Sequence, residues 1–161
     1  MFRFSDHSEA GTLLGRLLEK ETTQPNVVVL ALRVEAEAVA TSVAAVLESP
    51  LILQIPYVTP LPALEGSTII LVDDGFASVE ELYEAAAAAR MHRPGRLIAA
   101  APVATREVSA NASRIVDGFA FLATPRPFHS VGFWYEDTMR HVARAVFAGP
   151  ARSVAHKLQP A

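Results

Sequence analysis

Short runs of consecutive apolar residues alternate along this chain with stretches whose apolar residues recur every three or four positions. Unbroken β-branched runs of this kind are typical of strands buried on both faces of a parallel sheet, and the longer spacing is typical of amphipathic helices. The runs predict five strands, at residues 27–32, 51–55, 68–72, 97–101 and 118–123. The spacing predicts helices at residues 8–21, 35–47, 78–90, 105–114 and 135–147.

The alternation of strands and helices determines the expected fold class. Helical crossovers of this length join parallel strands with a right-handed connection and cover both faces of the sheet. The sequence therefore predicts a three-layer α/β/α fold with a parallel sheet, of the Rossmann-like kind. Ligands of such sheets bind beyond the carboxyl ends of the strands, so chemistry is expected in the loops after Leu32, Val72, Val103 and Thr124.

The composition agrees with one compact domain. The chain has 161 residues, 51% of them hydrophobic and 19% charged, which suffices for a full core. Gly149 and Pro150 end the last predicted helix. We therefore expect a single domain over residues 1–150, followed by a C-terminal tail at residues 151–161.

Charge and residue usage disfavour several functional classes. Seventeen acidic and fourteen basic side chains give a net charge of −3, and the arginines are scattered singly, which disfavours nucleic acid and a membrane surface as partners. The absence of cysteine removes disulfides and thiolate chemistry, and the five histidines lack paired metal-ligand spacing. Neither a signal peptide nor a run of about 20 apolar residues is present, so a cytoplasmic location is expected.

Two adjacent carboxylates, Asp73 and Asp74, follow the third predicted strand and are themselves followed by Gly75. The strand delivers them to the edge of the sheet, directly before a helix, where they can accept hydrogen bonds from vicinal ribose hydroxyls or bind Mg2+. The alternative is that acidic residues simply favour such a turn and the first turn of a helix. Ser78 and Glu81 have the spacing of a capping box.

This strand, acidic pair, glycine and helix resemble the phosphoribosyl diphosphate (PRPP) signature of type I phosphoribosyltransferases. Other segments resemble, in order, a bacterial phosphoribosyltransferase-like family, so the resemblance covers nearly the whole chain. These segments are residues 2–5, 9–11, 27–32, 101–104, 122–128, 131–132 and 135. The resemblance implies a phosphoribosyltransferase-like fold, a homodimer, and PRPP with Mg2+ held by Asp73 and Asp74.

The chain departs from the family pattern in the turn after the acidic pair. The family has a turn rich in threonine and glycine there, which holds a 5′-phosphate at a helix N-terminus. Here the corresponding positions include Ala77 and Ser78, with one hydroxyl and no glycine after Gly75, and Glu80 and Glu81 follow. If Ser78 and Glu81 form a capping box, they occupy donors that a phosphate needs. Weakened phosphate binding is therefore expected.

Two further departures concern the pyrophosphate loop and the hood of the family. The loop after the first strand lacks glycine, although Arg33 can still pair with a phosphate oxygen; the alternative is an ordinary connection with a surface arginine. Between the second and third strands only residues 56–67 are available, three of them proline. Twelve such residues are too few for a mobile two-stranded lid.

Aromatic residues gather after the last predicted strand. This region often contacts the base in phosphoribosyltransferases, so the resemblance implies that aromatic rings here stack on a planar ligand. The rings are those of Phe128, Phe133, Trp134 and Tyr135. The alternative is that they anchor the loop to the core or form a dimer contact, since aromatic residues dominate both settings.

Three functional hypotheses follow from these features. The favoured one is a phosphoribosyltransferase-like protein with an eroded PRPP site, which acts as a nucleotide- or sugar-phosphate-binding or regulatory domain with little or no transferase activity. The second is an active phosphoribosyltransferase that uses PRPP and a nucleobase. The third is a structural subunit of an oligomer. No residue is assigned a catalytic role, and whether the chain is an enzyme stays open.

Overall fold

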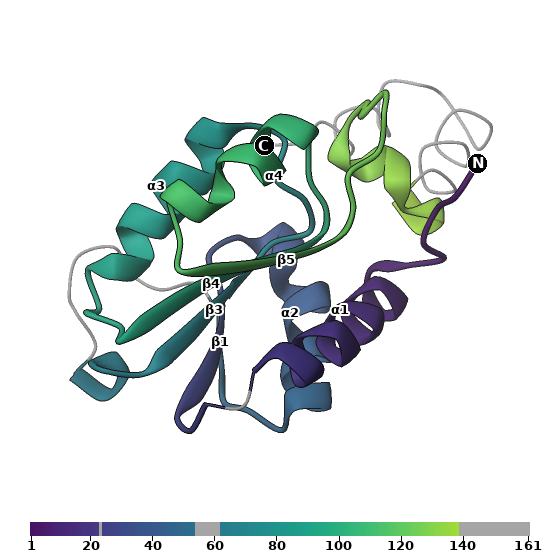
Figure 1. The fold of residues 1–161 in the computed structure, drawn as a ribbon. Helices are drawn as coiled ribbons and strands as arrows, with labels where there is room; N and C mark the ends of the chain where they lie inside the picture. Colours follow the sequence, from purple (N-terminus) through teal and green to yellow (C-terminus); the bar gives the residue numbers. More distant parts are fainter. Residues whose placement is uncertain (23, 54–61, 139–161) are drawn as a thin grey trace, which may run out of the picture.

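The part of the chain that the structure describes is built around one five-stranded parallel sheet with the strand order β2-β1-β3-β4-β5. Figure 1 labels β1, β3, β4 and β5 of this sheet. The computed structural model describes residues 1–22, 24–53 and 62–138. The strands are β1 (Val27–Ala31), β2 (Leu51–Leu53), β3 (Thr68–Val72), β4 (Arg96–Val103) and β5 (Gly118–Ala123). The predicted parallel sheet is confirmed.

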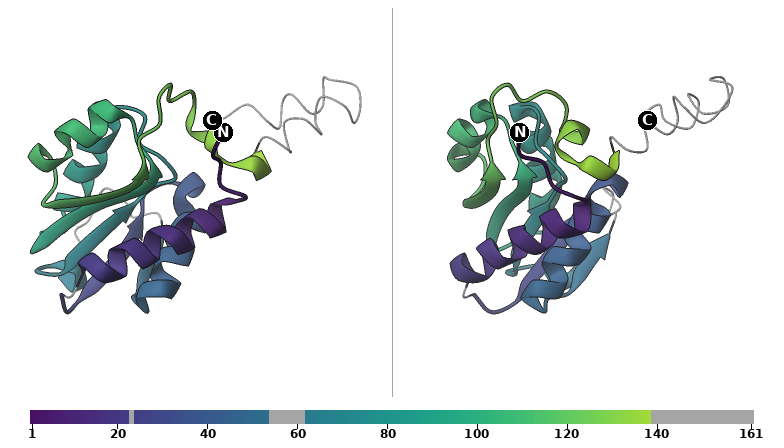
Figure 2. Two further views of the ribbon diagram at one scale, coloured as in Figure 1. Left: turned by 45° about the vertical axis from the view of Figure 1, so that its right-hand side comes forward. Right: turned by 90° about the vertical axis from the view of Figure 1, so that its right-hand side faces the viewer.

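Among the described residues, the α-helices α1 to α4 cover the sheet, and they lie on both of its faces (Figures 1 and 2). They are α1 (His7–Glu21), α2 (Glu37–Leu47), α3 (Val79–Arg90) and α4 (Arg106–Asn111). The first two lie on one face and the last two on the other (Figure 1). The predicted three-layer α/β/α fold is therefore confirmed.

Side-chain caps begin three of these helices at the residues that the sequence favours. Asp6, Ser78 and Thr105 each accept a hydrogen bond from the backbone N–H three residues later. Such caps satisfy donors that have no partner within the helix. The helix predicted at 35–47 instead opens with a 3-10 turn before α2, and the one predicted at 105–114 ends in a 3-10 turn after α4.

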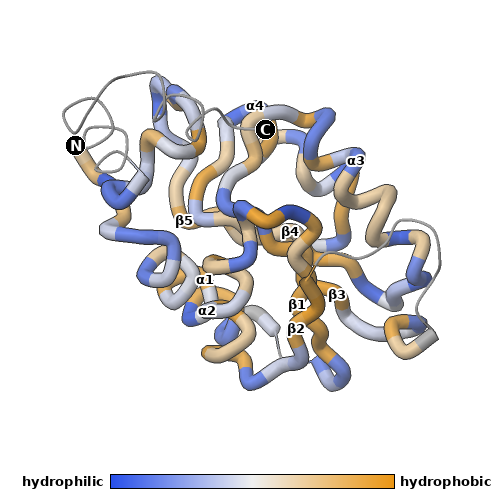
Figure 3. Tube along the Cα trace, turned by 180° about the vertical axis from the view of Figure 1, so that it is seen from behind, coloured by the Kyte–Doolittle hydropathy of each residue, from blue (hydrophilic) through white to orange (hydrophobic). Residues whose placement is uncertain are grey.

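The strands are apolar on both sides because helices cover both sides. Every residue of β3 is buried. Ile69 and Leu71 pack towards α3 and α4, whereas Ile70 and Val72 pack towards α1 and α2. The hydropathy of the trace follows this arrangement, with the most apolar stretches along the strands (Figure 3).

The first residues of the chain pair with residues near position 135. Phe4 forms a parallel bridge with Tyr135, the Phe4 N–H donates to the Trp134 carbonyl at 2.9 Å, and the Glu136 N–H donates to the Phe4 carbonyl at 2.8 Å. Tyr135 is thus extended backbone, so the prediction that a helix begins there is wrong by one residue: residues 136–138 are helical. The pairing with Phe4 holds Tyr135 in an extended conformation, so the helix begins only after it.

Several predictions lie outside the described residues. They concern residues 54–55 of the second strand, residues 56–61 of the loop that follows it, residues 139–147 of the last helix, and the tail at 151–161. Among the described residues, no helix is long and apolar enough to cross a membrane.

Candidate functional site

The acidic pair lies at the carboxyl edge of the sheet, directly after β3. The Asp73 N–H donates to the Ala100 carbonyl at 3.1 Å, so the pairing of β3 with β4 extends into the turn. The Asp74 N–H donates to Asp73 Oδ1 at 2.8 Å. Asp73 is 6% exposed. The sheet therefore holds this carboxylate in a fixed position.

Gly75 allows a close approach between this turn and the loop before residue 135. A Cβ atom at Gly75 would lie 2.8 Å from Val131 Cγ1 and 3.0 Å from Val103 Cγ2. Contacts below 3.0 Å require atoms to move, so a side chain at this position would force the Val131 side chain to shift. The glycine thus serves packing around the turn.

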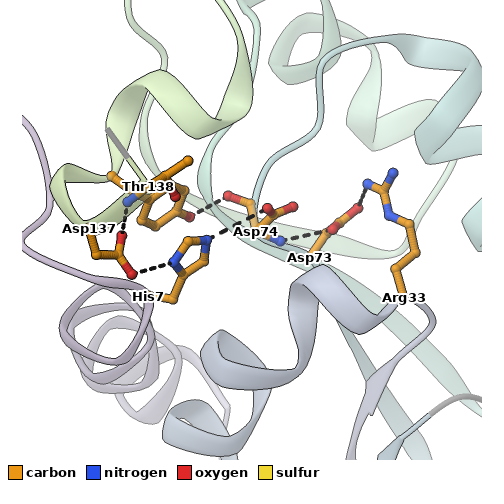
Figure 4. Close-up of polar contacts among 7 residues, drawn as sticks. His7, Arg33, Asp73, Asp74, Asp137 and Thr138 are labelled. Carbon is orange, nitrogen blue, oxygen red and sulfur yellow. Dashed lines mark hydrogen bonds and ion pairs between the residues drawn. The ribbon is translucent and has the colours of Figure 1, made fainter. Parts of the chain in front are cut away.

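Arg33 forms an ion pair with Asp73, as Figure 4 shows. Arg33 comes two residues after β1, and Asp73 follows β3, which pairs with β1 in register so that Ala31 is opposite Val72. Two adjacent parallel strands that end at the same level bring their following residues together. Burial, followed by the charge of Asp74, raises the pKa of Asp73 above its usual range, while Arg33 opposes that rise.

His7 lies between the carboxylates of Asp74 and Asp137 (Figure 4). Its Nε2 atom lies 3.8 Å from Asp74 Oδ2, and its Nδ1 atom lies 3.3 Å from Asp137 Oδ2. The imidazole stacks on the Tyr135 ring, with centroids 3.8 Å apart and an interplanar angle of 6°. Both carboxylates of the acidic pair are therefore faced by a basic side chain from another segment.

Tyr135 connects the terminal pairing to the acidic turn. Its side chain is fully buried, and its hydroxyl donates a hydrogen bond to the Asp74 carbonyl. Burial, followed by the charges of Asp74, Asp73 and Asp137, raises the pKa of Tyr135 above its usual range. The phenol is therefore a permanent donor, which fixes the backbone of the turn.

The bridging position of His7 makes stability depend on pH. Burial lowers the pKa of His7, but the hydrogen bonds and charges of Asp74 and Asp137 outweigh it and raise the pKa above its usual value. A raised folded-state pKa contributes stability that is complete below the unfolded-state pKa of about 6.5 and is lost as pH rises through the folded-state value.

Wild type should therefore exceed His7→Gln in free energy of unfolding by about 1 kcal/mol at acidic pH, the scale of a partly solvated hydrogen bond between charged groups. The difference should shrink as the pH rises past the raised His7 pKa. Urea denaturation of both proteins from about pH 5 to pH 9 spans the relevant titration. A difference that is constant with pH would contradict the charged bridge.

In the turn before α3, two backbone N–H groups donate hydrogen bonds to side chains of the turn itself. Ser78 Oγ accepts from the Glu81 N–H at 3.2 Å, and Glu81 Oε2 accepts from the Ala77 N–H at 3.1 Å. This reciprocal arrangement is close to the predicted capping box, although the Glu81 carboxylate reaches Ala77 rather than Ser78. A phosphate at this helix terminus would have to displace the Glu81 carboxylate from the Ala77 N–H.

A cavity of about 330 Å³ lies beside the Arg33–Asp73 pair, under the first two turns of α3. Five of its nine lining residues are apolar, and the charged ones are one arginine and three acids. The lining residues are Leu32, Arg33, Leu71, Val72, Asp73, Phe76, Glu81, Glu84 and Ala85. The volume is in the range of small-molecule sites, and the charge balance disfavours a free polyanion.

The aromatic loop packs onto the body of the protein. Trp134 is 6% exposed and its indole N–H donates to the Phe128 carbonyl. Phe128 and Phe133 are half-buried against the cluster that contains Phe4 and Tyr135. These contacts are those of the anchoring alternative, and a role of Phe128, Trp134 or Tyr135 in base stacking stays a prediction.

Metal binding by the acidic pair also stays a prediction. Within the described ranges, no group of three or more histidine or acidic side chains is arranged to hold a metal ion. Asp73 and Asp74 alone offer two carboxylates, and Mg2+ in such sites takes its remaining ligands from water and from substrate phosphates.

His7 is the site residue that sequence reasoning missed. The five histidines show no ligand spacing within short motifs, whereas the His7–Asp137 contact joins residues 130 positions apart. The only available signal was that His7 lies within the opening segment that resembles the phosphoribosyltransferase-like family, next to residues 2–5.

Comparison with known proteins identifies the fold. No protein-family model matches the chain. TT1426 from Thermus thermophilus is 24% identical with a TM-score of 0.69, over 83% of this chain and 90% of that one. A purine phosphoribosyltransferase from Pyrococcus horikoshii is 16% identical with a TM-score of 0.53, over 71% and 81%.

A hypoxanthine-guanine-xanthine phosphoribosyltransferase is 16% identical with a TM-score of 0.54, over 75% of this chain and 76% of that one. At these identities the likeness is one of architecture, and function has to be argued from the site. The chain therefore has a phosphoribosyltransferase-like three-layer α/β fold.

Proposed function

We propose that this protein is a phosphoribosyltransferase-like binding or regulatory domain, which recognises a nucleotide or sugar phosphate and has little or no transferase activity. One observation carries the proposal: both carboxylates of the acidic pair already face basic side chains of the protein, Arg33 at Asp73 and His7 at Asp74. Ligand hydroxyls or Mg2+ must compete with these internal partners. A ligand therefore binds to the two carboxylates only by replacing the basic side chains that already contact them.

The turn before α3, where the family binds a 5′-phosphate, supports the same proposal. Phosphoryl and ribosyl transfer depend on positioning and on donors preorganised for developing charge. Here the Ala77 and Glu81 N–H groups are engaged within the turn. The neighbouring cavity carries the carboxylates of Glu81 and Glu84. The engaged N–H groups weaken the binding of a 5′-phosphate, and the carboxylates beside Arg33 weaken the stabilisation of a leaving pyrophosphate.

The second candidate function is an active phosphoribosyltransferase. The observation in its favour is the convergence of Asp73, Asp74 and Arg33 at the carboxyl edge, where ligands of such sheets bind. In that case Asp73 and Asp74 hold ribose hydroxyls and Mg2+, Arg33 pairs with a phosphate oxygen, and a base displaces pyrophosphate. A homodimer remains a prediction from the family resemblance in either case.

Calorimetric titration with PRPP, with and without Mg2+, tests the proposal. Wild type should bind, the double variant Asp73→Asn/Asp74→Asn should not, and no purine or pyrimidine base should release pyrophosphate. The matched control is Glu19→Gln/Glu107→Gln, which removes two exposed carboxylates elsewhere and should bind as wild type does. Circular dichroism verifies that each variant is folded.

Separate outcomes would contradict the absence of transferase activity and the binding of a ligand at the acidic pair. Pyrophosphate release by wild type with any base would establish the active transferase. Failure of wild type to bind PRPP, ribose 5-phosphate and nucleotides alike would leave the structural-subunit hypothesis. Binding that survives in the double variant would move the ligand site away from the acidic pair.

A further inference from the structure

We propose that Arg33 is a built-in competitor, which holds Asp73 in the free protein and moves to the Glu81 side of the adjacent cavity when a phosphorylated sugar binds. This inference rests on the proposed function, because it describes how the same site is controlled. The geometry points to it through three features: the unequal freedom of the two partners, a second acceptor for Arg33, and the chemistry of the exchange.

The two members of the ion pair differ in their freedom to move. The Asp73 side chain is 8% exposed, its backbone N–H is bonded into the sheet, and its Oδ1 accepts from the Asp74 N–H. The Arg33 side chain is 43% exposed and comes from the loop after β1. Arg33 can therefore rotate away at little structural cost, whereas Asp73 cannot turn to a ligand while Arg33 occupies its outer oxygen.

A second acceptor for the guanidinium lies across the cavity. Arg33, Asp73 and Glu81 line the same volume of about 330 Å³. Burial lowers the pKa of Arg33, but the contact with Asp73 and the charges of Asp74 and Glu81 raise it overall. An arginine that leaves Asp73 therefore keeps a charged partner.

The exchange favours one class of ligand. A buried carboxylate that loses its partner is costly unless another donor replaces the guanidinium. Vicinal hydroxyls supply such donors to Asp73, and a phosphate on the same ligand supplies an acceptor to the freed Arg33. A phosphorylated sugar satisfies both halves of the broken pair, whereas a neutral sugar or inorganic phosphate satisfies only one.

Ribose, inorganic phosphate and ribose 5-phosphate are the probes that separate these contributions, each titrated calorimetrically into wild type and Arg33→Gln. Removing a competing state removes its penalty on apparent affinity. Arg33→Gln should therefore bind ribose about tenfold or more tightly than wild type, within the usual range of coupling between sites. It should also lose the advantage that ribose 5-phosphate has over ribose in wild type.

Two variants serve as controls. Arg90→Gln removes an arginine of similar exposure, 47%, whose ion pair with Asp117 lies outside this site, and ribose affinity should not change. Glu81→Gln keeps an oxygen for the Ala77 N–H but removes the charge that would receive Arg33. This variant should bind ribose, which carries no phosphate for Glu81 to repel, several-fold more weakly than wild type, because the Arg33–Asp73 pair is then favoured.

Each outcome decides the inference. Unchanged or weaker ribose binding by Arg33→Gln, or no binding at all by this variant when circular dichroism finds it folded, would overturn it. Tighter ribose binding by Arg33→Gln when wild type binds neither PRPP nor ribose 5-phosphate would support the competitor and contradict the proposed function. Equal gains in Arg33→Gln and Arg90→Gln would assign the effect to net charge and overturn it.

Discussion

Replacing Tyr135 by alanine is expected to lower the free energy of unfolding by about 3–5 kcal/mol, the cost of deleting a large buried aromatic side chain. Tyr135 is fully enclosed, with its ring centroid 3.8 Å from that of His7 and 5.7 Å from that of Phe4. The truncation removes the surface on which His7 stacks and the donor to the Asp74 carbonyl. Both the turn at Asp74 and the start of the chain at His7 therefore lose their contacts with this side chain.

Tyr135→Phe is the matched control, because it keeps the ring and removes only the hydroxyl. Its expected cost is about 1–3 kcal/mol, since the Asp74 carbonyl then loses its donor in a largely buried setting. Urea denaturation monitored by circular dichroism measures both variants. Equal losses for alanine and phenylalanine would contradict the claim that ring packing dominates this contact.

Replacing Gly11 by valine is expected to lower the free energy of unfolding by about 2 kcal/mol or more, because it overpacks the contact of α1 with α2. A Cβ atom at Gly11 would lie 2.5 Å from the Val39 carbonyl oxygen and 2.8 Å from Ser42 Cβ. One of these atoms belongs to the backbone of α2, so the contact is relieved only if the helices separate.

The sign of the effect of Gly11→Ala separates tertiary packing from helix propensity. Propensity alone predicts that alanine stabilises a helix by about 1 kcal/mol relative to glycine, whereas the close approach predicts destabilisation. The control Arg16→Val places the same β-branched side chain on the exposed face of α1, where a change of about 0.5 kcal/mol is expected. Thermal and urea denaturation measure all three variants. Stabilisation by Gly11→Ala would overturn the account.

The strands and helix starts were predictable because their causes are local. Residues 68–72 form an unbroken apolar run, and such a run is stable only where both faces of a strand are covered. Ser78 is a residue type that caps a helix through its own side chain, whatever lies further away. The backbone of Tyr135 was mispredicted because the bond from the Glu136 N–H to the Phe4 carbonyl joins distant parts of the chain.

The position of the acidic pair was also predictable, but the partners of the two carboxylates were not. A strand followed by a helix places Asp73 and Asp74 at the carboxyl edge of the sheet by topology alone. Arg33 was singled out from the sequence as a partner for phosphate, and the structure pairs it with Asp73, 40 positions away. Which residues meet across such separations depends on strand order and register, which hydropathy does not encode.

The sequence by itself therefore determined the three-layer α/β architecture and the position of the acidic pair at the carboxyl edge of the sheet, because apolar periodicity and capping act within a few residues. Only the tertiary structure decided that Arg33 and His7 face the two carboxylates, since β1 lies beside β3 and the chain start pairs with residue 135. Partner choice at this site is a property of packing between distant segments.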